Sequence, residues 1–266
     1  MKLGAIQRWA GRRTLPKIIC LHGFLGNGKD FTIVKDHYPN HPTLIAPNFP
    51  DYTERPTEDF SWNHCMSSLD TFIQSESTHG PCVLMGYSMG GRIALQYALQ
   101  YSDHLAGLIL IGATPGIADE EKKVIRLEKD LTLAANLKKQ SMEHFLENWF
   151  KQDIIQSQIQ IPEPYRSAML TTRKANNRVA LIQSLSSLGT GSMTSGWDQL
   201  SRFKRPTLLV TGEQDSKFQR IASKMATLLP NAHNTSIKGA GHACCFEQAE
   251  SFGKVVETFL SSINVG

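Results

Sequence analysis

A single serine stands inside a glycine-rich hexapeptide whose spacing suits nucleophilic chemistry. The stretch is Gly86-Tyr-Ser-Met-Gly-Gly91, and it lies between an apolar run and a helical pattern, as a G-x-S-x-G nucleophile elbow requires. The glycines let strand and helix backbones approach around a tight, strained turn, which lifts the hydroxyl of Ser88 above the sheet edge. We therefore interpret Ser88 as catalytic and not as an idle serine in a glycine-rich turn.

A serine hydroxyl is a weak nucleophile or base alone, so it needs an imidazole and a carboxylate that fixes the imidazole's tautomer. The apolar run 207–210 leads into Gly212-Glu-Gln-Asp215, and Gly239-Ala-Gly-His242 forms a loop before the last helical pattern. These positions predict Asp215 as the acid and His242 as the base. The alternative acids are Glu213, Asp198 and Asp153.

Negative charge that develops in such a site needs preorganised donors. The backbone amides of Phe24 and Met89 are our candidates for an oxyanion hole, because one follows the first apolar run and the other follows the serine. His22 also stands at a strand end, and we expect it to pack beneath the site without transferring protons.

The composition is that of an ordinary globular protein. The chain has 266 residues, 41% hydrophobic and 20% charged, with a net charge of +4. That charge is too weak and dispersed to indicate nucleic-acid binding, and no apolar run approaches the ~20 residues of a membrane-spanning helix. The N-terminus lacks the pattern of a secretory signal, so we expect a cytoplasmic protein. The number of subunits stays open.

Five cysteines are scattered without C-x-x-C spacing. An odd number in this arrangement disfavours a disulfide framework or a zinc site, so we expect buried thiols and no metal site.

Short apolar runs and helical patterns alternate along most of the chain. The runs 17–21, 43–46, 82–85, 108–111 and 207–210 are apolar on both faces, which indicates a parallel sheet covered on both sides. The intervening helical patterns cover 59–73, 91–101, 218–229 and 247–260. The fold class is therefore α/β, a mostly parallel, doubly wound sheet.

One segment breaks this alternation. Residues 116–196 contain no convincing strand but three helical stretches, one of them at 119–139, where Val124, Leu127, Leu131 and Ala134 share a face. We predict a helical cap inserted between a first core part at 1–115 and a second at 197–266.

The chain resembles the α/β-hydrolases, in which serine, acid and histidine follow in that order. Finer matches resemble the 2-succinyl-6-hydroxy-2,4-cyclohexadiene-1-carboxylate synthase family of menaquinone biosynthesis. They are Leu21-His-Gly-Phe-Leu-Gly26, Gly86-Tyr-Ser-Met-Gly-Gly-Arg92, Gly116 with Glu120-Glu-Lys122 and Arg126, Asn148-Trp-Phe150, Arg173 with Asn176-Asn177, and Gly212-Glu-Gln-Asp-Ser-Lys-Phe218.

This resemblance implies a lyase that eliminates pyruvate from 2-succinyl-5-enolpyruvyl-6-hydroxy-3-cyclohexene-1-carboxylate, without a cofactor, by proton abstraction. Its small-molecule substrate carries three carboxylates, and arginine side chains bind carboxylates through paired, charge-assisted hydrogen bonds. The matched positions are Arg92, Arg126 and Arg173, and by the resemblance Tyr87 and Trp149 line the same pocket.

Two stretches depart from the family. Residues 46–56 lack its Asp-x-Pro-Gly-His-Gly turn, and Cys244-Cys245 lies close behind His242. The alternative functions are a serine carboxylesterase, a carbon–carbon bond hydrolase, and a relative of these enzymes that only binds a ligand. Three arginines around the nucleophile favour the synthase over an esterase of neutral substrates.

Overall fold

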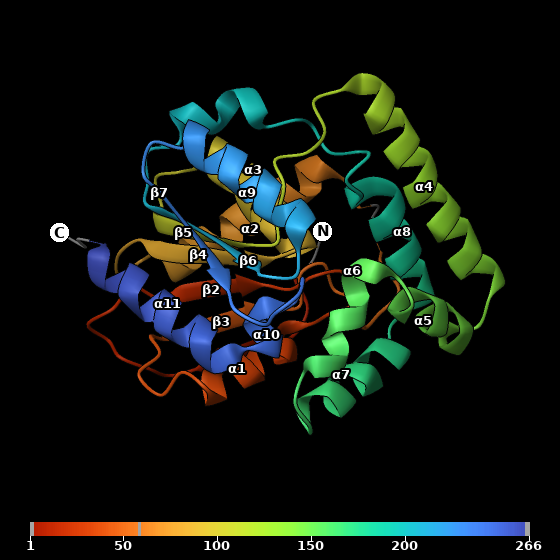
Figure 1. The fold of residues 1–266 in the computed structure, drawn as a ribbon, viewed down its shortest axis with the longest axis horizontal. Helices are drawn as coiled ribbons and strands as arrows, with labels where there is room; N and C mark the ends of the chain where they lie inside the picture. The colour runs from red at the N-terminus through yellow and green to blue at the C-terminus, as the bar shows by residue number, and fades with distance from the viewer. Residues whose placement is uncertain (1–2, 58–59, 264–266) are drawn as a thin grey trace.

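The computed structural model describes residues 3–57 and 60–263. Within these residues one sheet has the strand order β1-β3-β2-β4-β5-β6-β7, in which β1 is antiparallel to β3 and the other neighbours are parallel (Figure 1). The strands are β1 (Ile6–Trp9), β2 (Ile18–Leu21), β3 (Leu44–Pro47), β4 (Cys82–Tyr87), β5 (Leu105–Ile111), β6 (Thr207–Gly212) and β7 (Ala232–Ile237).

The five inner strands carry the predicted apolar runs. Every residue of β2, β3, β4, β5 and β6 is buried, which confirms two-sided burial and the parallel arrangement. The two edge strands carry no such run. Residues of β1 are exposed or half-buried in alternation, and most of β7 is polar, because an edge strand has only one covered flank.

Helices cover both faces of the sheet (Figure 1). Two apolar clusters fill the space between the sheet and these helices. One lies beneath α1, α10 and α11, and the other lies beneath α2, α3 and α9. Their bounds are α1 (Thr32–Asp36), α2 (Trp62–Glu76), α3 (Met89–Gln100), α9 (Ser216–Leu228), α10 (Cys244–Glu247) and α11 (Ala249–Ser262), with the turn η1 (Gly28–Phe31) before α1. The predicted start of one helix at Asp59 lies outside the described residues.

Between β5 and β6 the chain is helical and lies beside the sheet (Figure 1). The elements are α4 (Glu120–Lys139), α5 (Met142–Phe150), α6 (Asp153–Gln156), η2 (Ser157–Gln160), α7 (Tyr165–Lys174) and α8 (Arg178–Leu188), before η3 (Trp197–Arg202). We call the segment from α4 to α8 the cap segment. It holds more helices than the three predicted stretches, because prolines and short polar turns divide it. Domain limits at 116 and 196 stay a prediction.

The apolar face predicted for α4 coincides with its buried face at Ala134 but not at Val124 or Leu131. Val124 is 54% exposed and Leu131 is 45% exposed, whereas Asp130, Ala134 and Leu137 are buried against α8. The carboxylate of Asp130 lies on this buried face, and the apolar pattern of the sequence did not indicate it.

All five cysteines are free thiols and buried. Burial raises the pKa of Cys82 to about 11, and that of each other thiol further, which leaves all of them protonated and unreactive. Among the described residues, no helix is both long and apolar enough to cross a bilayer.

Candidate active site

The sharp turn between β4 and α3 exposes Ser88. Its backbone has φ 53° and ψ −108°, a left-handed conformation that a side chain rarely adopts, and its N–H donates to Ile111 O at 2.8 Å. A Cβ at position 86 would collide with the carbonyl of Gly90, and one at position 90 would collide with the carbonyl of Leu21. The glycines are therefore required by close backbone approach.

The structure brings Ser88, His242 and Asp215 together. His242 Nε2 lies 3.0 Å from Ser88 Oγ, and His242 Nδ1 lies 2.7 Å from Asp215 Oδ2. Because the ionised carboxylate can only accept, Nδ1 carries a proton and Nε2 is left to accept one from the serine. This arrangement can deprotonate a hydroxyl or a substrate carbon near Ser88.

Both partners are held from several sides. Asp215 caps α9, where its Oδ1 accepts from Phe218 N at 3.2 Å while Oδ2 faces the imidazole. The rings of Phe218 and Tyr87 pack on His242 at centroid distances of 4.7 and 5.5 Å. Sequence reasoning gave Phe218 no role, although its place in the first turn after Asp215 was an available signal.

The alternative acids lie elsewhere. Glu213 accepts from Gly239 N at 2.9 Å and so closes the loop before the histidine. Asp198 belongs to η3, and Asp153 lines the cleft on the cap side.

The turn after β2 lies against the serine. An added Cβ at Gly23 would stand 3.6 Å from the Cβ of Ser88, which places the predicted amide of Phe24 in this neighbourhood. Met89 is the first residue of α3, so its N–H has no carbonyl partner within the helix. Both positions are compatible with an oxyanion hole.

His22 lies beneath this turn and is fully buried. Its Nδ1 donates to Gly23 O at 2.9 Å, and its Nε2 accepts from Phe49 N at 3.0 Å. Burial lowers the pKa of His22 to about 4, so the ring is neutral and both nitrogens are engaged by backbone. It has no proton to exchange with substrate.

Two of the candidate arginines are neighbours. Arg92 lies one turn past Ser88 on α3 and donates from Nη1 to Leu188 O at 2.8 Å. Burial and, to a smaller extent, the charge of Arg126 lower its pKa to about 10, so Arg92 stays cationic at neutral pH. Arg126 pairs through Nε with the buried Asp130 at 2.9 Å, a partner that sequence reasoning missed.

Arg173 lies near Tyr87 and the buried Asp30, whose pKa burial raises to about 6. Its guanidinium stands 5.6 Å from the ring centre of Phe150, and its buried Nε has no hydrogen-bond partner within the described residues. A buried cation with an unused donor is costly unless a ligand completes it, so this position suits an anionic group.

Aromatic side chains pack together at the turn that follows β2. Trp149 packs on Phe24 at 5.1 Å between ring centres, and Tyr52 packs on the other edge of Phe24 at 6.0 Å. Tyr52 belongs to the segment that departs from the family pattern, and its hydroxyl lies 2.8 Å from Ser184 Oγ in α8. Tyr52 therefore connects the core to the cap segment, in the stretch where the family has a glycine-rich turn and this chain does not.

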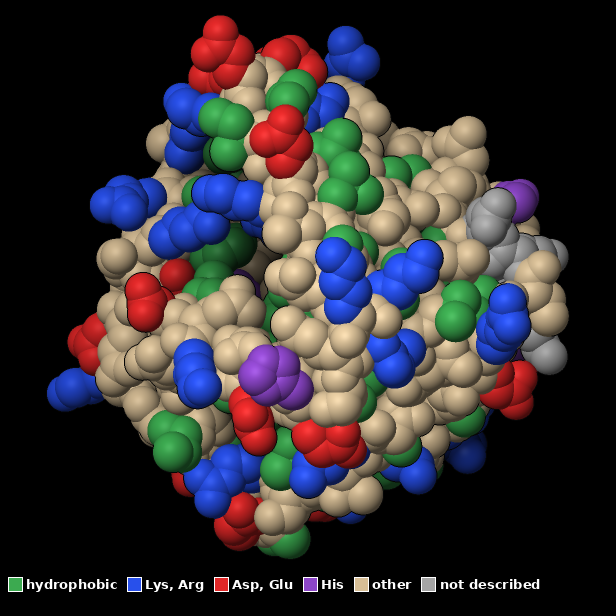
Figure 2. Space-filling view, turned by 90° about the vertical axis from the view of Figure 1, so that its right-hand side faces the viewer, with side chains coloured by type: hydrophobic (Ala, Val, Ile, Leu, Met, Phe, Trp, Pro, Cys, Tyr) green, Lys and Arg blue, Asp and Glu red, His purple; other side chains and the backbone are tan. Residues whose placement is uncertain are grey.

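A cleft of about 530 Å³ adjoins the triad. Its walls come from the cap segment, through Asp153 to Gln160, and from the core, through Gln214 to Lys217 with Gly241 and His242. Figure 2 shows a hollow on the face that carries the cap segment, with Lys and Arg side chains gathered along one side.

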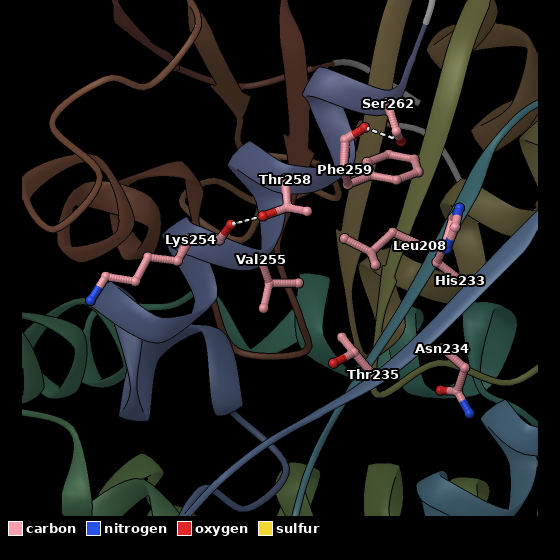
Figure 3. Close-up of a pocket in the computed structure, with 9 residues that line it drawn as sticks. All are labelled: Leu208, His233, Asn234, Thr235, Lys254, Val255, Thr258, Phe259 and Ser262. Carbon is pink, nitrogen blue, oxygen red and sulfur yellow. Dashed lines mark hydrogen bonds between the residues drawn. The ribbon is translucent and has the colours of Figure 1, made fainter.

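A second cavity of about 410 Å³ lies between β7 and α11, lined in part by Leu208, His233 and Phe259 (Figure 3). It is remote from Ser88, and we assign it no part in the chemistry.

Comparison with known proteins agrees with this geometry. Residues 16–249 match the family model described as the alpha/beta hydrolase fold, which confirms the predicted fold class. An esterase from Thermogutta terrifontis has a TM-score of 0.75 at 20% identity, covering 97% of this chain and 93% of its own, and shares the fold.

Three relatives are more specific. A putative 2-succinyl-6-hydroxy-2,4-cyclohexadiene-1-carboxylate synthase from Bacillus subtilis is 32% identical over 92% of this chain and 90% of its own. The synthase of Photorhabdus laumondii is 29% identical over 97% of this chain and 90% of its own. The structure of MenH from S. aureus has a TM-score of 0.89 at 28% identity and covers 96% of this chain and 97% of its own. The chain therefore belongs to the α/β-hydrolase fold family and, within it, to the 2-succinyl-6-hydroxy-2,4-cyclohexadiene-1-carboxylate synthases.

Proposed function

We propose that this enzyme eliminates pyruvate from 2-succinyl-5-enolpyruvyl-6-hydroxy-3-cyclohexene-1-carboxylate to give 2-succinyl-6-hydroxy-2,4-cyclohexadiene-1-carboxylate in menaquinone biosynthesis. The observation that carries the proposal is the contact between the Ser88 hydroxyl and a histidine backed by Asp215, in a region that also holds the half-buried Arg92 and the buried Arg173. The predicted setting is the cytoplasm, with a polycarboxylate small molecule as the partner.

Proton abstraction is the task of the triad in this proposal. His242 takes the proton of Ser88, and the polarised Ser88 oxygen removes a ring proton of the substrate. The electron pair of that C–H bond at C2 forms the C2–C3 double bond, and the pair of the ring C3–C4 double bond moves to C4–C5. The C5–O bond to the enolpyruvyl group then breaks, and its electron pair stays on the departing oxygen. The departing oxygen accepts the proton held by His242, which restores the triad, and the enol of pyruvate tautomerises to pyruvate.

Charge that develops during this step has preorganised partners. The amides of Phe24 and Met89 would face the developing anion, and each such donor contributes about 3 kcal/mol in sites of this kind. Arg92, Arg126 and Arg173 would hold the carboxylates from two sides. Tyr87 and Trp149 would line the pocket between them.

Replacing Ser88 tests the proposal. We expect Ser88→Ala to lower pyruvate release by at least about 10³-fold, because no other group takes over the polarised oxygen. Pyruvate is followed by NADH oxidation with lactate dehydrogenase. Turnover equal to that of the unmodified enzyme would contradict the role of the triad.

A hydrolase is the second candidate, because the same three contacts can form an acyl-enzyme. Parallel assays with p-nitrophenyl esters separate the two functions. We expect the enolpyruvyl substrate to be turned over far faster than the neutral esters. The reverse order, with no pyruvate released, would favour a carboxylesterase or a carbon–carbon bond hydrolase.

A further inference from the structure

Glu247 is a buried carboxylate next to the loop that carries His242, and it belongs neither to the triad nor to the proposed substrate-binding groups. Glu247 ends α10, five positions after His242, and is 4% exposed. Within the described part of the chain, no lysine, arginine or histidine nitrogen lies within 4 Å of it. A buried carboxylate without a cation is costly unless hydrogen bonds satisfy it.

Three donors satisfy Glu247, and two of them flank the base. Its Oε2 accepts from the backbone N–H of Gly241 at 2.5 Å, and its Oε1 accepts from the N–H of Ala243 at 3.1 Å. Gly241 and Ala243 are the residues immediately before and after His242. The carboxylate therefore fixes the backbone on both sides of the residue that carries the imidazole.

The third donor comes from the cap segment. The hydroxyl of Ser157, at the start of η2, donates to Glu247 Oε1 at 2.7 Å. The same side chain packs directly over Gly241, where an added Cβ would collide with it. Ser157, Gly241 and His242 also line one cleft. A residue of the cap segment thus touches the catalytic loop at the position next to the base.

From these contacts we infer that Glu247 is a positioning residue for His242 and that Ser157 completes its hydrogen bonding from the cap segment. The imidazole must face Asp215 at 2.7 Å and Ser88 at 3.0 Å at the same time. Side-chain contacts set the ring plane, but the position of the ring along the loop depends on the backbone that Glu247 holds. A displacement of about 1 Å in such a group lowers rates by about 10²-fold. The inference rests on the proposed function only for its use of His242 as the base.

Glu247→Gln is the principal test, because the amide keeps the size of the side chain but presents a donor to one of the two N–H groups. We expect kcat for pyruvate release to fall by about 10- to 100-fold, with KM changed less than about 2-fold, since the substrate contacts stay in place. Ser157→Ala removes one donor and leaves both amide contacts, and its kcat falls by about 2- to 5-fold.

Glu250→Gln is the matched control. Glu250 lies three positions further on, is exposed, and pairs on the surface with Lys254 at 2.7 Å, so its loss should change neither kcat nor KM. All variants are assayed well below their melting temperatures, which are measured in parallel. A Glu247→Gln protein that melts earlier but keeps kcat would overturn the inference, because Glu247 would then be structural only.

Two further readouts separate this inference from the proposed function. The rate at which a fluorophosphonate probe modifies Ser88 depends on His242 and needs no natural substrate; we expect about 10-fold slower labelling in Glu247→Gln and none in Ser88→Ala. We expect the proton between His242 Nδ1 and Asp215 Oδ2 to give a downfield NMR signal that broadens or shifts in Glu247→Gln and persists in Glu250→Gln.

The outcomes are distinct. If the unmodified enzyme reacts with the probe but releases no pyruvate, the proposed function fails and the positioning role stands on the labelling rates. Equal labelling rates and an unchanged downfield signal in Glu247→Gln exclude the positioning role. If Glu247→Gln does not fold, Ser157→Ala decides by the same readouts, and unchanged values there overturn the inference.

Discussion

At the scale of single residues, the buried imidazole of His22 makes the stability of the folded protein depend on pH. Its folded-state pKa of about 4 lies below the ordinary value of 6.5, because burial disfavours the charged ring. The unfolded chain therefore binds a proton first as the pH falls, and the stabilisation present above pH 6.5 is lost as the pH approaches 4.

We expect the free energy of unfolding to fall by about 2 kcal/mol between about pH 7.5 and pH 5 on account of His22. Urea denaturation at both values measures it, with His22→Gln as the comparison, since glutamine takes up no proton. Asp30, whose raised pKa acts in the opposite direction, is common to both proteins and cancels. An equal loss in the variant would show that other groups cause the pH dependence.

At the scale of secondary-structure elements, Asp215 serves helix and triad together. One carboxylate oxygen caps α9 through Phe218 N, and the other fixes the tautomer of His242. The site and the helix that follows it are therefore positioned by one side chain.

Two substitutions separate these roles. Asp215→Asn keeps a capping oxygen but presents an N–H to His242, so we expect kcat to fall by about 10³-fold or more, with stability nearly unchanged. Asp215→Ala should lose similar activity and also about 1 kcal/mol of stability, because the cap is gone. Pyruvate release and urea denaturation measure the two effects. A large fall in stability for Asp215→Asn would contradict the separation.

Sequence pattern was informative where burial is two-sided or a motif imposes its own geometry. The inner strands and the order of Ser88, Asp215 and His242 could be predicted for this reason. Edge strand β7 could not, since its polar residues face solvent. The buried face of α4 also could not, because the placement of Asp130 depends on how the cap segment folds back onto α8.

The same distinction holds within the site. Ser88 and Arg92 are close in sequence, so the elbow itself fixes their relation. Glu247 and Ser157 are 90 positions apart, and only the folded chain shows that they meet. Long-range polar contacts of this kind leave no local pattern.

At the scale of the whole molecule, the site gathers positive charge on a chain whose net charge is only +4. Burial and then the nearby charge of Arg126 lower the pKa of Lys217, while Asp215 raises it, so these two cations lie close together at the site. Such a concentration of cations attracts a polyanion from solution, and salt screens the attraction.

We expect kcat/KM for the tricarboxylate substrate to fall several-fold as ionic strength rises from about 0.02 to 0.3 M, because the Debye length shortens over this range. Steady-state pyruvate release measures the dependence. Arg126→Gln should reduce its slope, and a neutral ester should show almost none. A slope of the same size for the neutral ester would point to a salt effect on the protein itself.

The complete burial of the native thiols has a practical consequence. Because Cys20, Cys65, Cys82, Cys244 and Cys245 are all at most 1% exposed, a maleimide dye reaches none of them in the folded enzyme. One cysteine placed on the outer side of α4, at Lys129 for example, would be the sole point of attachment. Fluorescence from that single label can then follow the cap segment during turnover in a chain that otherwise keeps its own residues.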